Sequence, residues 1–132
     1  MQATLLTPDA DAMKKMSEVI TLDNGSTMSI FCNPNLVTNI HEADITLELL
    51  TNAGSKKTRQ QAYVPDFGKV WFDDQAIANI FGFKYLVKFH RITYDSAKED
   101  AFLIHAPGGI IRFKATEDGL YQYQVSDKYK HD

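Results

Sequence analysis

The chain has 132 residues, of which 44% are hydrophobic and 23% charged, as expected for one globular domain with a substantial core. Its formal net charge of −3 at pH 7 argues against the basic surface with which nucleic-acid-binding domains neutralise phosphates. No apolar run is long enough to span a membrane. We therefore expect partners other than nucleic acid or a membrane.

The chain divides into a lead-in and one domain. Residues 1–18 predict a flexible N-terminal segment, because the charged and polar residues around Met13-Lys14-Lys15-Met16 support at most a short helical turn. The alternation of apolar and polar residues that is typical of strands begins only at Val19. The domain is therefore expected to cover residues 19–132.

Short strands separated by turn residues account for most of the domain. The pattern predicts strands at Val19–Leu22, Met28–Phe31, Ile45–Leu50, Gln60–Val64, Lys69–Phe72, His90–Tyr94, Ala101–His105, Ile110–Lys114 and Leu120–Val125. One short helix is expected at Phe83–Lys88. This spacing predicts an all-β fold, either a barrel or a sandwich.

The first predicted strand runs directly into a polar segment. Its members are Asp23, Asn24, Gly25, Ser26 and Thr27. An Asn-Gly pair between apolar runs is a strong hairpin signal without any chemistry. A carboxylate at a strand end, a glycine that permits a sharp turn and neighbouring hydroxyls are also what an aspartic protease requires. Both interpretations fit this segment taken alone.

The features that follow favour the protease. Two carboxylates that share a proton must be supplied by two lobes, and a chain with one such segment must therefore form a symmetric dimer. A hairpin flap must cover the substrate, and a turn in the right place is formed by Asn52, Ala53, Gly54 and Ser55. A second apolar strand must lie beside the Asp23 loop and end in two bulky residues and a glycine. Ile80, Phe81 and Gly82 match it, directly before the predicted helix.

Other kinds of site have little support. The four histidines are dispersed, so no metal site is expected, and no phosphate-binding glycine loop or nucleophile elbow is present. The single cysteine, Cys32, follows apolar residues and is expected to be a buried, inert thiol. We expect no cofactor.

The order of these motifs resembles the retropepsin fold, and the sequence is most similar to the protease domain of copia-type LTR retrotransposon polyproteins, in particular a branch found in algae such as diatoms. The resemblance covers roughly residues 19–125. Its residues are Leu22 to Thr27, Ile30-Phe31-Cys32-Asn33, Asn52-Ala53-Gly54, Gly68-Lys69-Val70-Trp71, Ile77-Ala78-Asn79-Ile80 and Gly119-Leu120-Tyr121.

The resemblance implies an acid-protease barrel with extra C-terminal strands, acting as a homodimeric aspartic endopeptidase. Its substrate would be the element's own Gag-Pol-type polyprotein, inside a cytoplasmic virus-like particle. Asp23 would be catalytic, and Gly25 would allow the two loops to approach. The hydroxyl of Ser26 would bond the outer carboxylate oxygen. Retropepsins usually carry Thr or Ser where this chain has Asn24, whose amide can also donate and accept across a dimer.

Two further interpretations remain open. The domain could be a catalytically silent retropepsin-like module of the polyprotein, a reading that Asn24 and the single flap glycine, Gly54, favour. It could also be an unrelated small β-barrel in which the Asp23 segment is a plain hairpin. Burial separates the hairpin from the other two, because a paired, inward-facing Asp23 excludes it, and cleavage of a peptide separates the enzyme from the silent module.

Overall fold

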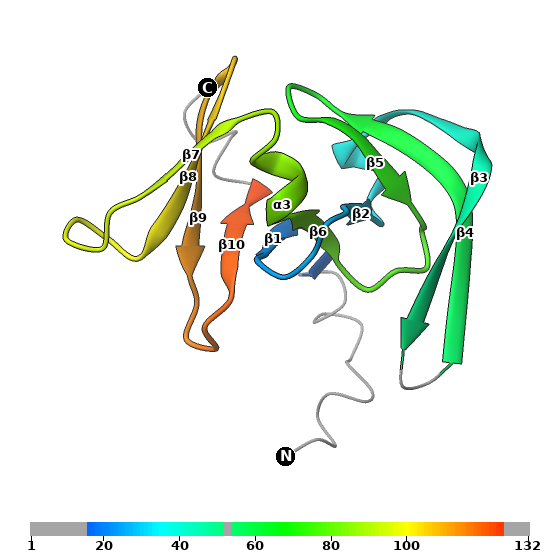
Figure 1. The fold of residues 1–132 in the computed structure, drawn as a ribbon, viewed down its shortest axis with the longest axis horizontal. Coiled ribbons are helices and arrows are strands. Elements are labelled where there is room, and N and C mark those ends of the chain that lie inside the picture. Colours follow the sequence, from blue (N-terminus) through cyan, green and yellow to red (C-terminus); the bar gives the residue numbers. More distant parts are fainter. Residues whose placement is uncertain (1–15, 52–53, 126–132) are drawn as a thin grey trace.

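The computed structural model describes residues 16–51 and 54–125 (Figure 1). Within them, strands dominate and one short α-helix is present, which confirms the all-β class. The strands are β1 (Val19–Asp23), β2 (Ile30–Phe31), β3 (Thr38–Thr51), β4 (Gly54–Val64), β5 (Gly68–Phe72), β6 (Asn79–Gly82), β7 (Arg91–Tyr94), β8 (Ala101–Ala106), β9 (Gly109–Ala115) and β10 (Tyr121–Gln124). A 3-10 turn, η1 (Pro34–Leu36), follows β2, and the helix α3 (Phe83–Leu86) follows β6.

All ten strands of the described residues belong to one mixed sheet. Its order is β3-β4-β5-β2-β6-β1-β10-β9-β8-β7, so the sheet is open, with β3 and β7 at its edges. Figure 1 shows β3, β4 and β5 on one side and β7, β8 and β9 on the other, with β1, β2, β6 and α3 between them. The expected barrel is therefore not closed by the strand pairings of this part of the chain.

The centre of the sheet depends on how β6 is threaded. It pairs in parallel with β1, where Asp23 faces Gly82, and antiparallel with β2, where Ile30 faces Ile80. The two strands that flank the Asp23 loop are therefore not neighbours, because β6 lies between them. The loop from β1 to β2 has to pass over the end of β6.

Aromatic residues fill the core on one face of this sheet. The ring of Phe81 lies at the middle of the cluster, 4.9 Å from Phe31, 5.1 Å from Phe67 and 6.5 Å from Phe113 between ring centroids. Phe31, Phe81 and Phe113 are at most 1% exposed. Aromatic side chains buried to this degree each contribute several kcal/mol, roughly 3–5 kcal/mol when truncated to alanine. Phe81 thus holds β6 in place from the core side.

The strands after residue 90 complete the sheet beside β1. They form an antiparallel run from β7 to β10, and β10 pairs antiparallel with β1, with Val19 facing Gln124 and Leu22 facing Tyr121. Tyr121, Tyr123 and Val125, which are alternate residues of the predicted strand Leu120–Val125, pack against the core. The C-terminal strands therefore pair, through β10, with the side of β1 that β6 does not occupy.

Several element bounds differ from the expectation. The hairpin of β3 and β4 is much longer than predicted. Its polar residues show no clear alternation of their own, and pairing between the two strands keeps them extended. β3 shifts register twice, between Thr38 and His41 and between Glu42 and Leu47, and such bulges blunt an edge strand. β2 is reduced to two residues, and α3 ends at Leu86 rather than Lys88.

A carboxylate and two phenols tie the C-terminal strands together. Oδ1 of Asp100 accepts hydrogen bonds from the hydroxyl of Tyr94, at 2.7 Å, and from that of Tyr121, at 2.8 Å. The bond from Tyr94 and then that from Tyr121 lower the pKa of Asp100. The same contact raises the pKa of Tyr94 to about 12. The cluster links β7 and β10 to the start of β8.

This cluster predicts a distinct alkaline titration. Among the six tyrosines, Tyr94 should ionise near pH 12 in a spectrophotometric titration, well above the ordinary phenol. Because the folded pKa is raised, the contact stabilises the fold below about pH 10 and is lost as the pH rises towards 12. Because the pKa of Asp100 is lowered, its contribution is lost only as the pH falls through acidic values. Asp100→Asn should return Tyr94 towards its usual titration range, and an unchanged titration would contradict the assignment.

Candidate active site

Asp23 is the last residue of β1 and lies exposed at the start of the loop. Its Oδ1 accepts the backbone N–H of Gly25 at 2.9 Å, and its carbonyl accepts that of Ser26 at 3.3 Å. These bonds fix the tight turn after Asp23. The hairpin interpretation of Asn24 and Gly25 is wrong, because β1 is paired with β6 and β10 and not with the strand that follows the turn.

The other polar residues of the loop differ in their contacts, because Ser26 is bonded within the loop and Asn24 and Thr27 are exposed. The hydroxyl of Ser26 donates to the carbonyl of Met28 at 2.7 Å and accepts its N–H at 3.3 Å. The expectation that Ser26 bonds the outer oxygen of Asp23 is therefore not met within this chain, since the hydroxyl is engaged in its own turn. Asn24 and Thr27 are exposed, and their side chains are available to a partner.

Gly82 lies against the loop so closely that no side chain fits. A Cβ built there would lie 2.5 Å from the carbonyl oxygen of Met28 and 2.9 Å from its nitrogen. The loop therefore rests directly on the backbone at the end of β6, beside Asp23. The predicted motif of two bulky apolar residues and a glycine is brought to the Asp23 loop, with Phe81 in the core and Gly82 facing Asp23.

Sequence reasoning missed the role of Asn79, which is fully buried at the start of β6. Its Oδ1 accepts the N–H groups of Cys32 and Asn33, and its Nδ2 donates to the carbonyls of Ser17 and Val19, all between 2.9 and 3.1 Å. The signal that could have revealed it is an amide in an otherwise apolar strand, because such a group must find internal partners. Asn79 joins the start of β1 to the end of β2.

The face of the sheet that carries Asp23 also carries half-exposed apolar residues. Residues that face one another in a sheet share a side, so Thr21, Ile80, Ile30 and Trp71 follow one another across the adjacent strands β1, β6, β2 and β5. All four are half-buried, and Asp23 follows Thr21 by two positions on the same side. This face offers an apolar surface beside the carboxylate.

A recess of about 170 Å³ lies close to the loop and includes part of this surface. It is lined by Met28, Ser29, Gln61, Lys69, Val70, Trp71 and Tyr85. The lining has a cation and an amide but no carboxylate. Met28 and Ser29, which follow the Asp23 loop in the chain, form one side of the recess lining.

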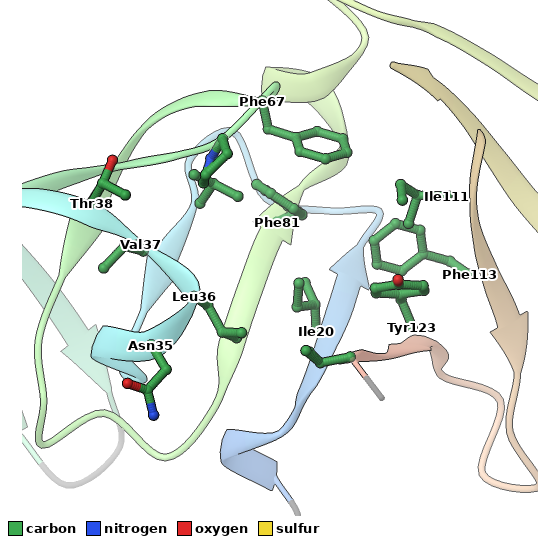
Figure 2. A pocket seen from close by; sticks show the side chains of 13 residues that line it. Ile20, Asn35, Leu36, Val37, Thr38, Phe67, Phe81, Ile111, Phe113 and Tyr123 are labelled. Atoms are coloured by element: carbon green, nitrogen blue, oxygen red, sulfur yellow. The ribbon is translucent and has the colours of Figure 1, made fainter. Parts of the chain in front are cut away.

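A second cavity, of about 140 Å³, lies on the core side (Figure 2). Figure 2 shows Ile20 and Phe81 between Leu36 on one side and Phe113 and Tyr123 on the other. Asp23 is not among its lining residues, and the lining is mainly apolar. The two cavities share no lining residue and Asp23 lines neither, but the recess around Met28 includes Trp71 from the face that carries Asp23.

The expected flap is only partly described. Gly54 and Ser55 open β4 and are exposed, and Gly54 has a φ of +123°, which favours glycine. Asn52 and Ala53, and residues 1–15 of the predicted lead-in, lie outside the described residues. In Figure 1 the long hairpin of β3 and β4 extends beyond the neighbouring β5.

The other expected features are as follows. Cys32 is buried, as predicted, and burial raises the pKa of its thiol. Among residues 16–51 and 54–125, no three His, Cys, Asp or Glu side chains are grouped so as to hold a metal ion. In the same part of the chain, no helix has the length and apolar character needed to cross a membrane.

Comparison of the chain with protein-family models gave no match, and comparison with curated proteins gave none either. The fold and the geometry around Asp23 are therefore the basis for assigning a function.

Proposed function

We propose that this chain is an aspartic endopeptidase of the retropepsin type, active as a homodimer in which each copy supplies one Asp23. The observation that carries the proposal is the threading of β6 between β1 and β2, which sets Gly82 against Asp23 and leads directly into α3. A hairpin turn between two paired strands requires neither a strand inserted between them nor a glycine opposite Asp23. In this arrangement the exposed carboxylate of Asp23 lies on a loop that packs against the backbone of Gly82.

The chemistry requires two such loops to meet. Two carboxylates a few ångströms apart cannot both ionise easily, so they share one proton and hold one water between them. The ionised carboxylate removes a proton from the water as it attacks the peptide carbonyl, and the protonated one donates to the carbonyl oxygen. Asp23 is exposed in the single chain, as a residue completed by a second copy must be.

The substrate would lie along the face that carries Asp23. Half-buried Ile30, Trp71 and Ile80 offer apolar contacts there, and the β3–β4 hairpin would cover the bound peptide and exclude water. The resemblance to copia-type elements suggests that this peptide is a junction of the element's own polyprotein, cleaved within cytoplasmic virus-like particles. Neither a cofactor nor nucleic acid enters this mechanism.

Dimer dependence tests this proposal directly. A precursor that carries native flanking polyprotein should process itself at a rate that rises more than linearly with concentration, because each site needs two chains. Sedimentation over the same range should show the monomer converting to a dimer. Trp71 is the only tryptophan and lies on the proposed substrate face, so its fluorescence should change when a junction peptide binds. First-order processing by a strict monomer would rule out the shared site.

The silent-module alternative rests on two observations. Ser26 is engaged with Met28 rather than with the carboxylate, and Asn24 stands where a hydroxyl is usual in the family. If Asn24 is a weaker version of the cross-dimer contact, Asn24→Thr should keep or raise the processing rate and tighten dimerisation. Thr27→Ser, at the other exposed loop position, is the matched control. A dimer that binds junction peptides but cleaves none, in the wild type and in Asn24→Thr, would establish the silent module instead.

A further inference from the structure

Ser29 is a buried polar residue that the chemistry above does not use. It lies between the Asp23 loop and β2 and is only 3% exposed. A buried hydroxyl costs free energy unless it is bonded, so its partners show what it is for. Its Oγ accepts the N–H of Gly82 at 3.0 Å, and its carbonyl accepts that of Trp71 at 2.9 Å.

The bond to Gly82 joins the segment before β2 to the end of the neighbouring strand β6. Gly82 faces Asp23 across the parallel pair of β1 and β6. Ser29 belongs to the outgoing limb of the same loop that Asp23 begins. The hydroxyl therefore connects that limb to the one residue directly opposite the carboxylate, across 53 positions of sequence.

The other end of β6 is fixed independently. Asn79 faces Ile20 in the β1 register and holds four backbone groups of the segments around β1 and β2. These bonds of Asn79 act at the start of β6 and do not involve Gly82 at its end. Ser29 supplies the side-chain anchor at that end, next to Asp23.

We propose that Ser29 is a positioning residue for Asp23, acting through Gly82. This inference rests on the proposed protease function. Two carboxylates that share a proton tolerate little displacement, and an error of about 1 Å in a catalytic group can reduce the rate about 100-fold. The backbone contact of Gly82 with Met28 prevents the loop from moving inwards, and the bond from Gly82 to Ser29 prevents it from lifting away.

Ser29→Ala removes the acceptor without adding volume. We expect kcat to fall about 10- to 100-fold while KM is nearly unchanged, because the apolar substrate contacts of Ile30, Trp71 and Ile80 are kept. We also expect the bell-shaped pH profile of kcat to narrow, since carboxylates held further apart share one proton over a smaller pH range. Ser29→Thr keeps the hydroxyl and should restore both properties.

The matched control is Thr93→Val, which removes a half-buried hydroxyl bonded to His105 Nε2 at 2.9 Å in β7, at the far edge of the sheet. A purely structural loss lowers the amount of folded enzyme and leaves the width of the pH profile unchanged. Equal kcat per folded molecule and equal profile widths in Ser29→Ala and Thr93→Val would overturn the proposal.

Amide hydrogen exchange separates this inference from the protease function. In Ser29→Ala the N–H of Gly82 and that of Gly25, which bonds Asp23 Oδ1, should exchange faster, while Thr93→Val should leave both unchanged. A wild type that cleaves nothing would count against the protease, yet faster exchange at Gly25 would still support the positioning role. Unchanged exchange at Gly25 would reject that role, whatever the wild type does.

Discussion

Asp23→Asn should abolish proteolysis and leave the fold intact. The amide is nearly isosteric with the carboxylate and its oxygen can still accept the N–H of Gly25, but it can no longer act as a base. Loss of a general acid–base group reduces rates by about 10²–10⁴-fold, and here one substitution alters both copies of the pair. Because Asp23 is exposed, the free energy of unfolding should change by no more than about 0.5 kcal/mol.

Self-processing of the precursor and the melting temperature should be measured together for this variant. Asp74→Asn is a suitable control, because Asp74 is also exposed and accepts a hydrogen bond from Gln75 Nε2 that an amide oxygen can keep. It lies in the connection before β6, at the end of that strand away from Gly82. Equal processing by the wild type and by Asp23→Asn would exclude Asp23 as the catalytic residue.

Gly82→Ala should destabilise the protein more than any other glycine substitution that keeps an ordinary backbone conformation. The added Cβ would meet backbone atoms of Met28 at 2.5–2.9 Å, and backbone cannot move aside as a side chain can. Overpacking of this kind costs roughly 1–3 kcal/mol of the free energy of unfolding. The loop must also shift away from β6, so the processing rate should fall further than the loss of folded protein explains.

Denaturant unfolding of Gly82→Ala should be compared with that of Gly108→Ala. A Cβ at Gly108 would lie 2.6 Å from Asp66 Oδ2, which is the end of an exposed, flexible side chain and can turn away. The clash is similar in distance but different in kind, so Gly108→Ala should cost only a few tenths of a kcal/mol. Equal losses in the two variants would mean that the contact between Gly82 and Met28 is not tight in solution.

The strand content and the site motif could be read from local sequence. The apolar run before Asp23 predicted β1, and the pattern of Leu120–Val125 predicted a C-terminal strand, found as β10. These signals are local, because side-chain alternation and turn residues reflect the conformation of a few neighbouring residues. The same local signals favoured a hairpin at Asn24 and Gly25, which the strand order does not contain.

The longer hairpin and the buried polar contacts could not be predicted in this way. The polar residues at the start of β3 have little strand preference of their own and are extended because β4 pairs with them. The amide of Asn79 in an apolar strand indicates that it needs internal partners but not which ones, and Ser29 has no such signal; their side-chain partners lie 46 to 62 positions away. Ser26 has the residue type expected near a catalytic carboxylate, but its own turn offers it a closer partner at Met28.

The sequence by itself determined the all-β class, the turn after Asp23 and the apolar strand that ends at Gly82, because each depends on residues within a few positions of one another. Only the tertiary structure decided the order and register of the strands around β1. That choice brings Gly82 opposite Asp23 and β10 along the other edge, where Gln122 reaches Thr21 across 101 positions. The physical reason is that alternation specifies which face of a strand is buried, whereas the neighbour and the register are fixed by packing between segments far apart in the chain.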